Sequence, residues 1–325
     1  MPKAVVCREL GPPERLRLEI FSSAPLAAGQ VRVAVHAAGI NFPDILMAAG
    51  EYQLKPELPF TPGVEAAGEV SEIAGGVAGF AIGERVIVRM RHGAYADEVV
   101  VAPTQLTRLP SNFDFAQGAT FLAAHGTAHH ALVDRGRVQP GEVLLVHGAG
   151  GGVGLAAVEI GKLLGATVIA AASSEEKLGV AKARGADHLV LTTREPFRDA
   201  VKRITDGRGA DVVFDPVGGE IFGSSLRCIA WGARILVIGF TGGIGLARTN
   251  LLLIKGASVL GVRAGEAARR NPAAGEARIR RLLEWAETGK IGPHISHQLP
   301  LEDYAQAMRL LIDRKAIGRV ALITR

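Results

Sequence analysis

The stretch VHGAGGGVGLAAV (residues 146–158) holds five glycines between Gly148 and Gly154. It follows the apolar run VLLVH (143–147) and leads into the helix-like segment GLAAVEIGKLLG (154–165). A chain uses that many residues without a β-carbon where it turns sharply, or where a ligand approaches its backbone. A strand, a glycine-rich turn and a helix in this order are typical of a dinucleotide-binding unit.

The glycine spacing departs from the strict G-x-G-x-x-G pattern, because Ala149, Gly151 and Gly154 take the three places, while a looser spacing of Gly148, Gly151 and Gly154 also fits. Gly151 is expected to let the backbone approach a pyrophosphate, and Gly154 to let the helix pack on the strand. The helix start, Gly151, Gly152 and Val153, is predicted to offer unpaired N–H groups and the positive end of the helix dipole. The alternative is a glycine-rich turn that binds nothing.

Apolar runs alternate with helical patterns from about residue 140 onward, which indicates a parallel sheet covered on both faces. The six runs are VLLVH (143–147), ATVIAAA (166–172), HLVL (188–191), DVVFD (211–215), RILVIG (234–239) and SVLGV (258–262). Six such strands complete a doubly wound dinucleotide-binding sheet.

The two ends of the chain differ from this middle part. Period-2 alternation predicts strands at 30–40, 66–73 and 84–90. Helical patterns follow at 277–289 and 302–315, before a last strand at 319–324. We therefore expect an α/β protein with a strand-rich domain from residues 1–123 and 263–325, and a dinucleotide-binding domain, 124–262, inserted in it.

Composition narrows the class of protein further. Hydrophobic residues make up 48% and charged residues 21%, so the chain can bury a large core. We see no signal-peptide pattern and no apolar run long enough for a membrane span. Cys7 and Cys228 are far apart, as expected for the cytoplasm. The net charge of +5 is scattered, and RIRR (278–281) is interpreted as a solvated helix face, so no nucleic-acid partner is predicted.

The end of the second apolar run bears on which dinucleotide is bound. NAD sites place Asp or Glu about 20 residues after the glycine turn, and Ser173 stands there instead. A hydroxyl at Ser173 and the ammonium of Lys177 suit a 2′-phosphate, which favours NADP(H) over NAD(H). Alternatively, Ser173 and Glu176 form a capping box for the next helix, and both roles can hold together. Glu175 and Glu176 count against the phosphate unless they point away.

With this arrangement the sequence resembles the medium-chain dehydrogenase/reductase superfamily, and within it the zinc-independent quinone oxidoreductase (zeta-crystallin-like) branch. The motifs that carry the resemblance are AAGINFPDILMAAGEY (37–52), LPFTPGVEAAGEV (58–70), GGVG (151–154), ASSEEK (172–177), GADHLV (185–190), DVVFDPVGG (211–219), GARILVIGF (232–240) and GRVAL (318–322). The resemblance implies a GroES-like catalytic domain, a Rossmann domain, and a homodimer paired through residues 257–262.

Zinc-dependent members of the superfamily hold a catalytic zinc with Cys, His and a further Cys or acid. At those places this sequence has Asn41, Val64 and Ala123, so no metal is predicted. One alternative remains, because His125 and His129 lie four residues apart on an expected helix. Two histidines do not make a site, and they can equally pack or cap.

The resemblance implies that Asn41, Asp44 and Tyr52 form the catalytic part of the site. The Asn41 amide would contact the ribose on the nicotinamide side, and the Tyr52 phenol would donate to a substrate oxygen. Tyr52 can equally be a packed loop residue, and Asp44 a helix cap. Leu46 stands where many relatives carry an aromatic residue, which argues against simple stacking on a quinone and would allow a more aliphatic substrate.

The remaining cofactor contacts are also implied by the resemblance. Backbone groups of Ile238 and Phe240 are expected to hold the carboxamide, and Arg319 to lie near the adenosine end. The full expected set is Asn41, Thr127, Gly151, Gly152, Val153, Ser173, Lys177, Thr192, Val217, Ile238, Phe240 and Arg319.

These features predict an enzyme that transfers a hydride from NADPH to small-molecule quinones or α,β-unsaturated carbonyl compounds without a metal. A second hypothesis is an enoyl- or acryloyl-CoA reductase, for which the pair Arg269 and Arg270, together with RIRR (278–281), would supply a basic rim. A third, of another class, is a crystallin-like or sensor protein that binds NADPH without turnover.

Overall fold

The computed structural model describes residues 1–325, which divide into two compact units. The first unit is residues 1–123 and 293–325, and the second is 124–292. The second boundary lies later than the predicted 262, because the helices over 264–287 pack within the second unit. Arg278 pairs there with Asp134 at 2.7 Å, and the ring of Trp285 lies 5.7 Å from that of His129.

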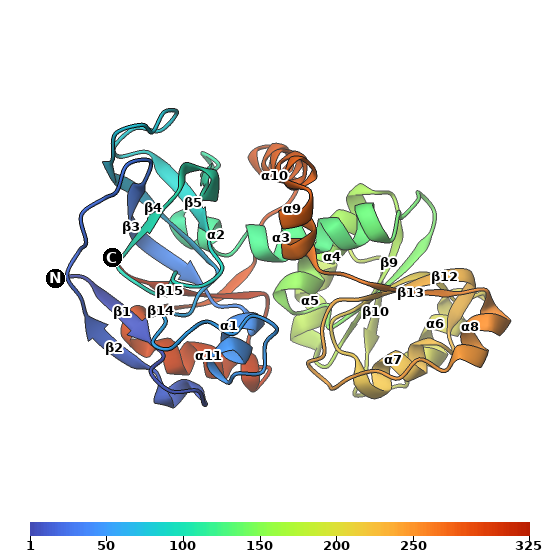
Figure 1. The fold of residues 1–325 in the computed structure, drawn as a ribbon. Coiled ribbons are helices and arrows are strands. Elements are labelled where there is room, and N and C mark those ends of the chain that lie inside the picture. Colours follow the sequence, from blue (N-terminus) through green and yellow to red (C-terminus); the bar gives the residue numbers. More distant parts are fainter. The chain divides into compact units, whose positions relative to one another are not determined.

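The first unit is built on a mixed sheet of seven strands, in the order β14-β15-β3-β4-β5-β7 with β6 beside β3 (Figure 1). Its strands are β1 (Lys3–Val6), β2 (Arg17–Ile20), β3 (Val31–Gly39), β4 (Glu65–Ile73), β5 (Arg85–Arg89), β6 (Glu98–Val101), β7 (Leu106–Arg108), β14 (Ile295–Pro300) and β15 (Arg319–Ile323), and its helices α1 (Phe42–Ala48), α2 (Phe115–Ala119) and α11 (Tyr304–Ile312). Strands β1 and β2 form a separate antiparallel pair.

The apolar residues of β3 explain its central place in this sheet. Val31, Val33 and Val35 are fully buried, and the strand pairs with β4, β6 and β15. β15 comes from the end of the chain, so the C-terminal segment completes a sheet that the N-terminal residues begin. Residues directly after β3 and at the starts of β4 and β15 supply the polar cluster described below.

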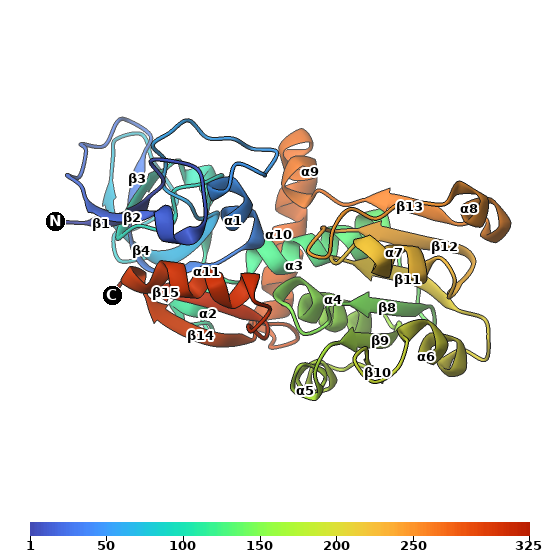
Figure 2. The same cartoon turned by 90° about the horizontal axis from the view of Figure 1, so that it is seen from below.

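The second unit contains a six-stranded parallel sheet in the order β10-β9-β8-β11-β12-β13 (Figure 2). Its strands are β8 (Val143–His147), β9 (Thr167–Ala172), β10 (His188–Leu191), β11 (Ala210–Asp215), β12 (Ile229–Val237) and β13 (Ser258–Gly261). Its helices are α3 (Leu122–His129), a π-helical continuation (His130–Arg135), α4 (Gly152–Leu163), α5 (Glu175–Ala183), α6 (Phe197–Ile204), α7 (Gly219–Ser225), α8 (Thr249–Lys255), α9 (Ala264–Arg270) and α10 (Pro272–Glu287). Helices α6, α7 and α8 cover one face, while α4 and α5 contact the sheet as its first crossovers.

This architecture confirms the predicted α/β fold, a GroES-like sheet with an inserted Rossmann sheet, and all six predicted parallel strands are present. One strand differs in extent: β12 runs from Ile229 to Val237, so Ile238 and Phe240 lie beyond its end. The interpretation of residues 278–281 as a solvated face is wrong for Arg278, which is buried because Asp134 pairs with it. None of the helices combines the length and apolar character that a membrane crossing needs.

Candidate functional site

The glycine turn joins the end of β8 to the start of α4. Gly148 takes a left-handed conformation, with φ of 57°, and its carbonyl accepts from the Gly151 N–H at 2.9 Å. Gly151 is the N-cap of α4, and the first helical hydrogen bond runs from Leu155 N to Gly151 O. The N–H groups of Gly152 and Val153 therefore precede the hydrogen-bonded part of the helix and have no backbone partner.

Gly154 is required where the turn meets the helix. A β-carbon there would lie 2.3 Å from the carbonyl oxygen of Gly148. The same position at Gly151 meets only that oxygen, at 3.4 Å, so the backbone beside Gly151 is open to a ligand. A tight turn, an approachable backbone and unpaired N–H groups at a helix start are what a pyrophosphate needs, so the residues fit a dinucleotide.

Lys177 lies against the glycine turn. A β-carbon built on Gly150 would come within 2.6 Å of the Lys177 Cβ, which shows that the lysine stem packs across Gly150. The capping box predicted at Ser173 is wrong. Helix α5 begins one residue later, so Ser174 is the N-cap and accepts from Lys177 N at 3.3 Å. Ser173 is left exposed at the end of β9.

The ends of β11 and β12 place further predicted cofactor residues at the carboxyl edge of the sheet. Ile238 N donates to the Asp215 carbonyl at 2.9 Å, and the Phe240 carbonyl accepts from Gly243 N at 2.9 Å. The Ile238 carbonyl and the Phe240 N–H make no hydrogen bond. This pair, one acceptor and one donor, is complementary to the N–H and C=O groups of a carboxamide.

Three other predicted cofactor residues, Val217, Thr192 and Thr127, also lie in or beside the second unit's helices and strands. The backbone of Val217 is fully engaged, because its N–H donates to Asp215 Oδ1 and its carbonyl accepts from Gly242 N. The Thr192 hydroxyl donates to the Ala172 carbonyl at 3.1 Å, which joins the ends of β10 and β9. Thr127 lies half-buried in α3.

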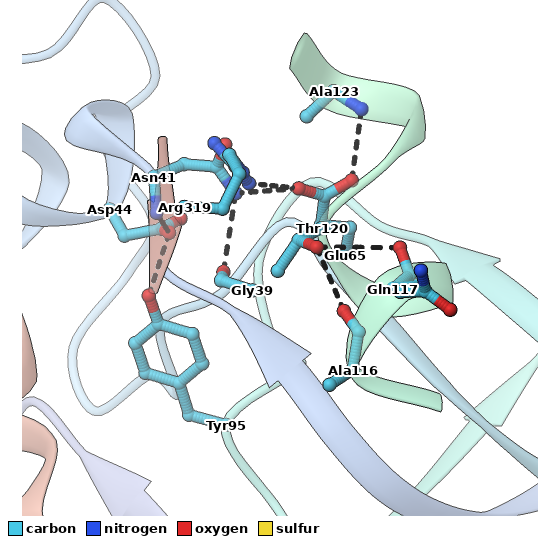
Figure 3. Close-up of polar contacts among 10 residues, drawn as sticks. All are labelled: Gly39, Asn41, Asp44, Glu65, Tyr95, Ala116, Gln117, Thr120, Ala123 and Arg319. Atoms are coloured by element: carbon cyan, nitrogen blue, oxygen red, sulfur yellow. Dashed lines mark hydrogen bonds and ion pairs between the residues drawn. The ribbon is translucent and has the colours of Figure 1, made fainter. Parts of the chain in front are cut away.

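In the first unit, Asn41 follows β3 and is the N-cap of α1, but its side chain makes no hydrogen bond to the helix. Its Nδ2 donates instead to the Gly39 carbonyl at 3.2 Å and to Glu65 Oε1 at 3.1 Å (Figure 3). Two acceptors fix the amide so that its nitrogen faces them. The carbonyl oxygen Oδ1 has no partner within the chain and is the atom that Asn41 can offer to a ligand.

Glu65, at the start of β4, holds this cluster together and was not among the predicted site residues. Its Oε1 also accepts from Arg319, and its Oε2 accepts from Ala123 N at 2.9 Å (Figure 3). Glu65 is 1% exposed, so its charge is compensated by Arg319 and these N–H donors rather than by water. No local pattern of residues indicates this role, since Arg319 lies 254 residues away.

Arg319 lies on β15 and is itself buried. Because it shares Oε1 of Glu65 with Asn41, its guanidinium and the Asn41 amide lie side by side. The two therefore cannot meet opposite ends of one dinucleotide, so the expected contact of Asn41 with the nicotinamide ribose and that of Arg319 at the adenosine end exclude each other. That Arg319 contacts the cofactor stays a prediction.

Asp44 is fully buried in the first turn of α1. Its Oδ2 accepts from Asn41 N at 2.8 Å and from the Tyr95 hydroxyl at 2.7 Å, while Oδ1 has no partner. Burial raises the pKa of Asp44 to about 7, against the opposing effect of these two donors. Asp44 therefore positions Asn41 through the helix start, and its carboxyl group is not exposed to a substrate.

Tyr52 is half-buried and packs against the core of the first unit. Its hydroxyl makes no hydrogen bond within the chain. A phenol hydroxyl without a partner in the chain can donate to a ligand. The same placement also agrees with the alternative that Tyr52 is a packed loop residue. Tyr95 differs from Tyr52 in this respect, because the Tyr95 hydroxyl already donates to Asp44.

The residues around Glu65 do not fit a catalytic zinc. The Asn41 amide nitrogen is turned toward Glu65, whose two oxygens already accept from Asn41, Arg319 and Ala123. Val64 and Ala123 have no ligating atoms. No group of three or more His, Cys, Asp or Glu side chains is arranged to hold a metal ion.

The two histidines of α3 have separate surroundings. His125 is buried with Nε2 3.0 Å from Glu159 Oε2 on α4, and Glu159 also pairs with Arg184. His129 packs against Trp285, and burial lowers its pKa to about 4, so it is neutral at neutral pH. The two histidines thus have different partners within the second unit, Glu159 for His125 and Trp285 for His129.

Comparison with known proteins agrees with this geometry. Residues 27–111 match the alcohol dehydrogenase GroES-like domain, and residues 152–286 match the family described as zinc-binding dehydrogenase. The quinone oxidoreductase-like protein 2 homolog of Nematostella vectensis is 40% identical over 99% of this chain and 89% of its own.

Two solved structures share the whole fold. Escherichia coli quinone oxidoreductase complexed with NADPH is 28% identical, with a TM-score of 0.91 over 99% of this chain and 100% of its own. An NAD-dependent alcohol dehydrogenase is 33% identical, with a TM-score of 0.90 over 99% of this chain and 100% of its own. The chain therefore belongs to the medium-chain dehydrogenase/reductase superfamily, in its quinone oxidoreductase-like branch.

Proposed function

We propose that this protein transfers a hydride from NADPH to quinones or α,β-unsaturated carbonyl compounds without a metal ion. The main support for the proposal is the orientation of the Asn41 amide. Its amide nitrogen is held by Glu65 and Gly39, so a neutral carbonyl oxygen is offered where zinc-dependent relatives have a metal-binding thiolate. Such a site cannot act as a Lewis acid, and it suits acceptors that are already electrophilic.

The second unit has the groups needed to hold the dinucleotide. The N–H groups of Gly152 and Val153 would bind the pyrophosphate, and Lys177 would pair with the 2′-phosphate. The Ile238 carbonyl and the Phe240 N–H would hold the carboxamide. When bound, the cofactor supplies the hydride that adds to the acceptor.

The first unit would serve the acceptor and the ribose. Asn41 Oδ1 is an acceptor for a ribose hydroxyl, and its orientation is set in advance by Glu65. The Tyr52 hydroxyl is the side-chain donor proposed for the substrate oxygen, on which negative charge develops as the hydride adds. A hydroxyl that donates a hydrogen bond to that oxygen would stabilise the negative charge and so lower the activation free energy of hydride transfer.

Part of the basic rim that supports the enoyl-CoA alternative is paired with an acidic side chain. The guanidinium groups of Arg269 and Arg270 both donate to Glu266 on the same helix, at 2.7 Å and 2.9 Å. They are thus partly neutralised, and a quinone or enone acceptor is favoured over a CoA thioester.

The test is steady-state oxidation of NADPH and of NADH by chelator-treated protein, with 1,4-benzoquinone, 2-cyclohexenone or crotonyl-CoA as the acceptor. We expect NADPH to be preferred, with turnover on the quinone or the enone. Faster turnover on crotonyl-CoA supports the thioester reductase instead. Tight NADPH binding without turnover on any acceptor supports the non-catalytic binding protein.

A further inference from the structure

The loop after β11 and the loop after β12 are hydrogen-bonded to each other through their backbones. Gly242 N donates to the Val217 carbonyl at 2.7 Å, and Gly219 N donates to the Gly243 carbonyl at 2.8 Å. These contacts need glycine, because a β-carbon on Gly219 would lie 2.3 Å from the Gly242 carbonyl oxygen. We call this pair of loops, residues 216–219 and 238–243, the strand-end clamp.

Asp215 anchors the clamp from inside the protein. It is the last residue of β11 and is 1% exposed. Its Oδ1 accepts from Val217 N and from Gly218 N, both at 2.9 Å, and its backbone carbonyl accepts from Ile238 N at 2.9 Å. One residue thus fixes the first loop by its side chain and the start of the second loop by its backbone.

One carboxyl oxygen of Asp215 makes no hydrogen bond, which bears on why this residue is an aspartate. Oδ2 is buried without a hydrogen-bond partner. Burying a carboxylate with only one oxygen bonded is costly, and an apolar residue at the end of β11 would avoid that cost. The carboxyl side chain therefore serves the geometry of the clamp rather than the stability of the core.

The clamp determines where two open backbone groups lie. Ile238 and Phe240 flank Gly239 in the second loop, and each has one backbone group engaged, by Asp215 and by Gly243 respectively. Their remaining groups, the Ile238 carbonyl and the Phe240 N–H, form the proposed carboxamide site. A displacement of a few tenths of an ångström in either loop would misalign this donor–acceptor pair.

We propose that Asp215 is a positioning residue that, through the strand-end clamp, makes the protein select a dinucleotide carrying a carboxamide on its pyridine ring. This inference rests on the proposed function only in so far as the protein binds NADPH. It requires no acceptor, so equilibrium binding can test it separately.

The experiment compares dissociation constants of NADPH and of its 3-acetylpyridine analogue, in which a methyl ketone replaces the carboxamide. The analogue cannot donate to the Ile238 carbonyl, so the wild-type protein is expected to bind NADPH about tenfold more tightly. In Asp215→Ala this preference should fall to within about twofold, because the clamp no longer holds the two groups in place. Asp215→Asn keeps an oxygen acceptor for Val217 and Gly218 and should retain most of the preference.

Binding of 2′-phospho-ADP-ribose, which has no pyridine ring, separates this effect from general damage. Its dissociation constant should be unchanged in Asp215→Ala. Asp211→Ala is the matched control, because Asp211 lies near the other end of β11 and its carboxylate accepts from Val143 N at 2.7 Å. This control should keep the full preference for NADPH.

Three results would overturn the inference. The first is that Asp215→Ala keeps the full preference for NADPH over the 3-acetylpyridine analogue. The second is that Asp211→Ala loses as much of this preference as Asp215→Ala does. The third is that Asp215→Ala weakens the binding of 2′-phospho-ADP-ribose by the same factor as the binding of NADPH. If Asp215→Ala does not fold, Gly242→Ala replaces it, since its β-carbon would press on Val217 Cγ1 at 3.0 Å. That variant should lose part of the preference, and no loss contradicts the clamp. Wild-type protein that binds neither dinucleotide refutes the proposed cofactor itself.

Discussion

The side chains of Glu65 and Asn41 are joined by a hydrogen bond of 3.1 Å from Nδ2 to Oε1, across 24 residues of sequence. Glu65 is in turn paired with Arg319 and bound to Ala123 N. The orientation of the Asn41 amide therefore depends on a buried carboxylate that does not itself face a ligand.

Replacement of Glu65 by Gln tests that dependence. A Gln side chain has only one acceptor oxygen for the three donors of Asn41, Arg319 and Ala123, and its own N–H groups would face one of them. We expect the free energy of unfolding to fall by about 3–5 kcal/mol, as when other buried ion pairs lose one partner. We expect kcat/KM for NADPH-dependent reduction to fall about tenfold, because Asn41 Oδ1 is no longer held in place.

Glu98→Gln is the matched control for this variant. Glu98 on β6 pairs with the buried Arg32 at 2.6 Å, in the same unit. This variant should lose stability while its kcat/KM stays within about twofold of wild type, since nothing near Asn41 changes. Equal losses of kcat/KM in both variants would show that Glu65 acts only through stability.

The protonation of Asp44 should appear in the pH dependence of stability. Its pKa is raised from 3.8 to about 7 in the folded chain, so between these values the folded state holds a proton that the unfolded state has released. The free energy of unfolding therefore falls as the pH rises from about 4 to about 7, by roughly 4 kcal/mol from this group.

Asp44→Asn removes the titrating group and keeps an acceptor for Asn41 N and for the Tyr95 hydroxyl. Urea unfolding at about pH 5 and about pH 8 should show a smaller loss of stability with pH in the variant than in wild type. Asp114→Asn, at the exposed N-cap of α2, should leave the wild-type dependence unchanged. A variant that keeps the full dependence would contradict a raised pKa at Asp44.

Lys177 should distinguish NADPH from NADH by its charge. Because the lysine stem packs across Gly150, Lys177→Met keeps the stem and removes only the ammonium. We expect the dissociation constant of NADPH to rise about 10–100-fold, as for the loss of one hydrogen bond to a charged group, and that of NADH to change little. Lys182→Met, in the last turn of the same helix, is the control. Similar losses for both dinucleotides would refute a 2′-phosphate contact.

Self-association through β13 stays a prediction of the family resemblance, and the second unit has a surface suited to it. β13 pairs only with β12, so its other edge is open. Nearby, Leu253 on α8 is 81% exposed, and Trp231 on β12 is 78% exposed. Light scattering at micromolar concentration should give twice the monomer mass, and Leu253→Glu should shift it toward the monomer. Ile20→Glu, on the first unit, should not, and a monomeric wild type would contradict the expectation.

The fold could be predicted because its signals are local. Each parallel strand is a short apolar run, and the glycine turn at Gly148–Gly154 identifies the first of them. Glu65 and Asp215 could not be assigned in the same way. Their roles depend on partners brought together by the sheets, such as Arg319 for Glu65 and Ile238 for Asp215, and no spacing in the sequence reports these contacts. The helix cap was misplaced by one residue, at Ser173 in place of Ser174, because only Ser173 has a glutamate, Glu176, three residues later, whereas Ser174 caps the helix without one.

Transfer of deuterium from NADPH labelled at the reactive C4 position is the sharpest test of hydride transfer without a metal ion. Chelator-treated protein is incubated with labelled NADPH and 2-cyclohexenone, and the product is analysed by mass spectrometry and NMR. We expect one deuterium at the β-carbon of cyclohexanone in the presence of the chelator. Transfer that requires added zinc, or no labelled product from the enone or from crotonyl-CoA and no reduction of benzoquinone while NADPH is bound, would contradict it.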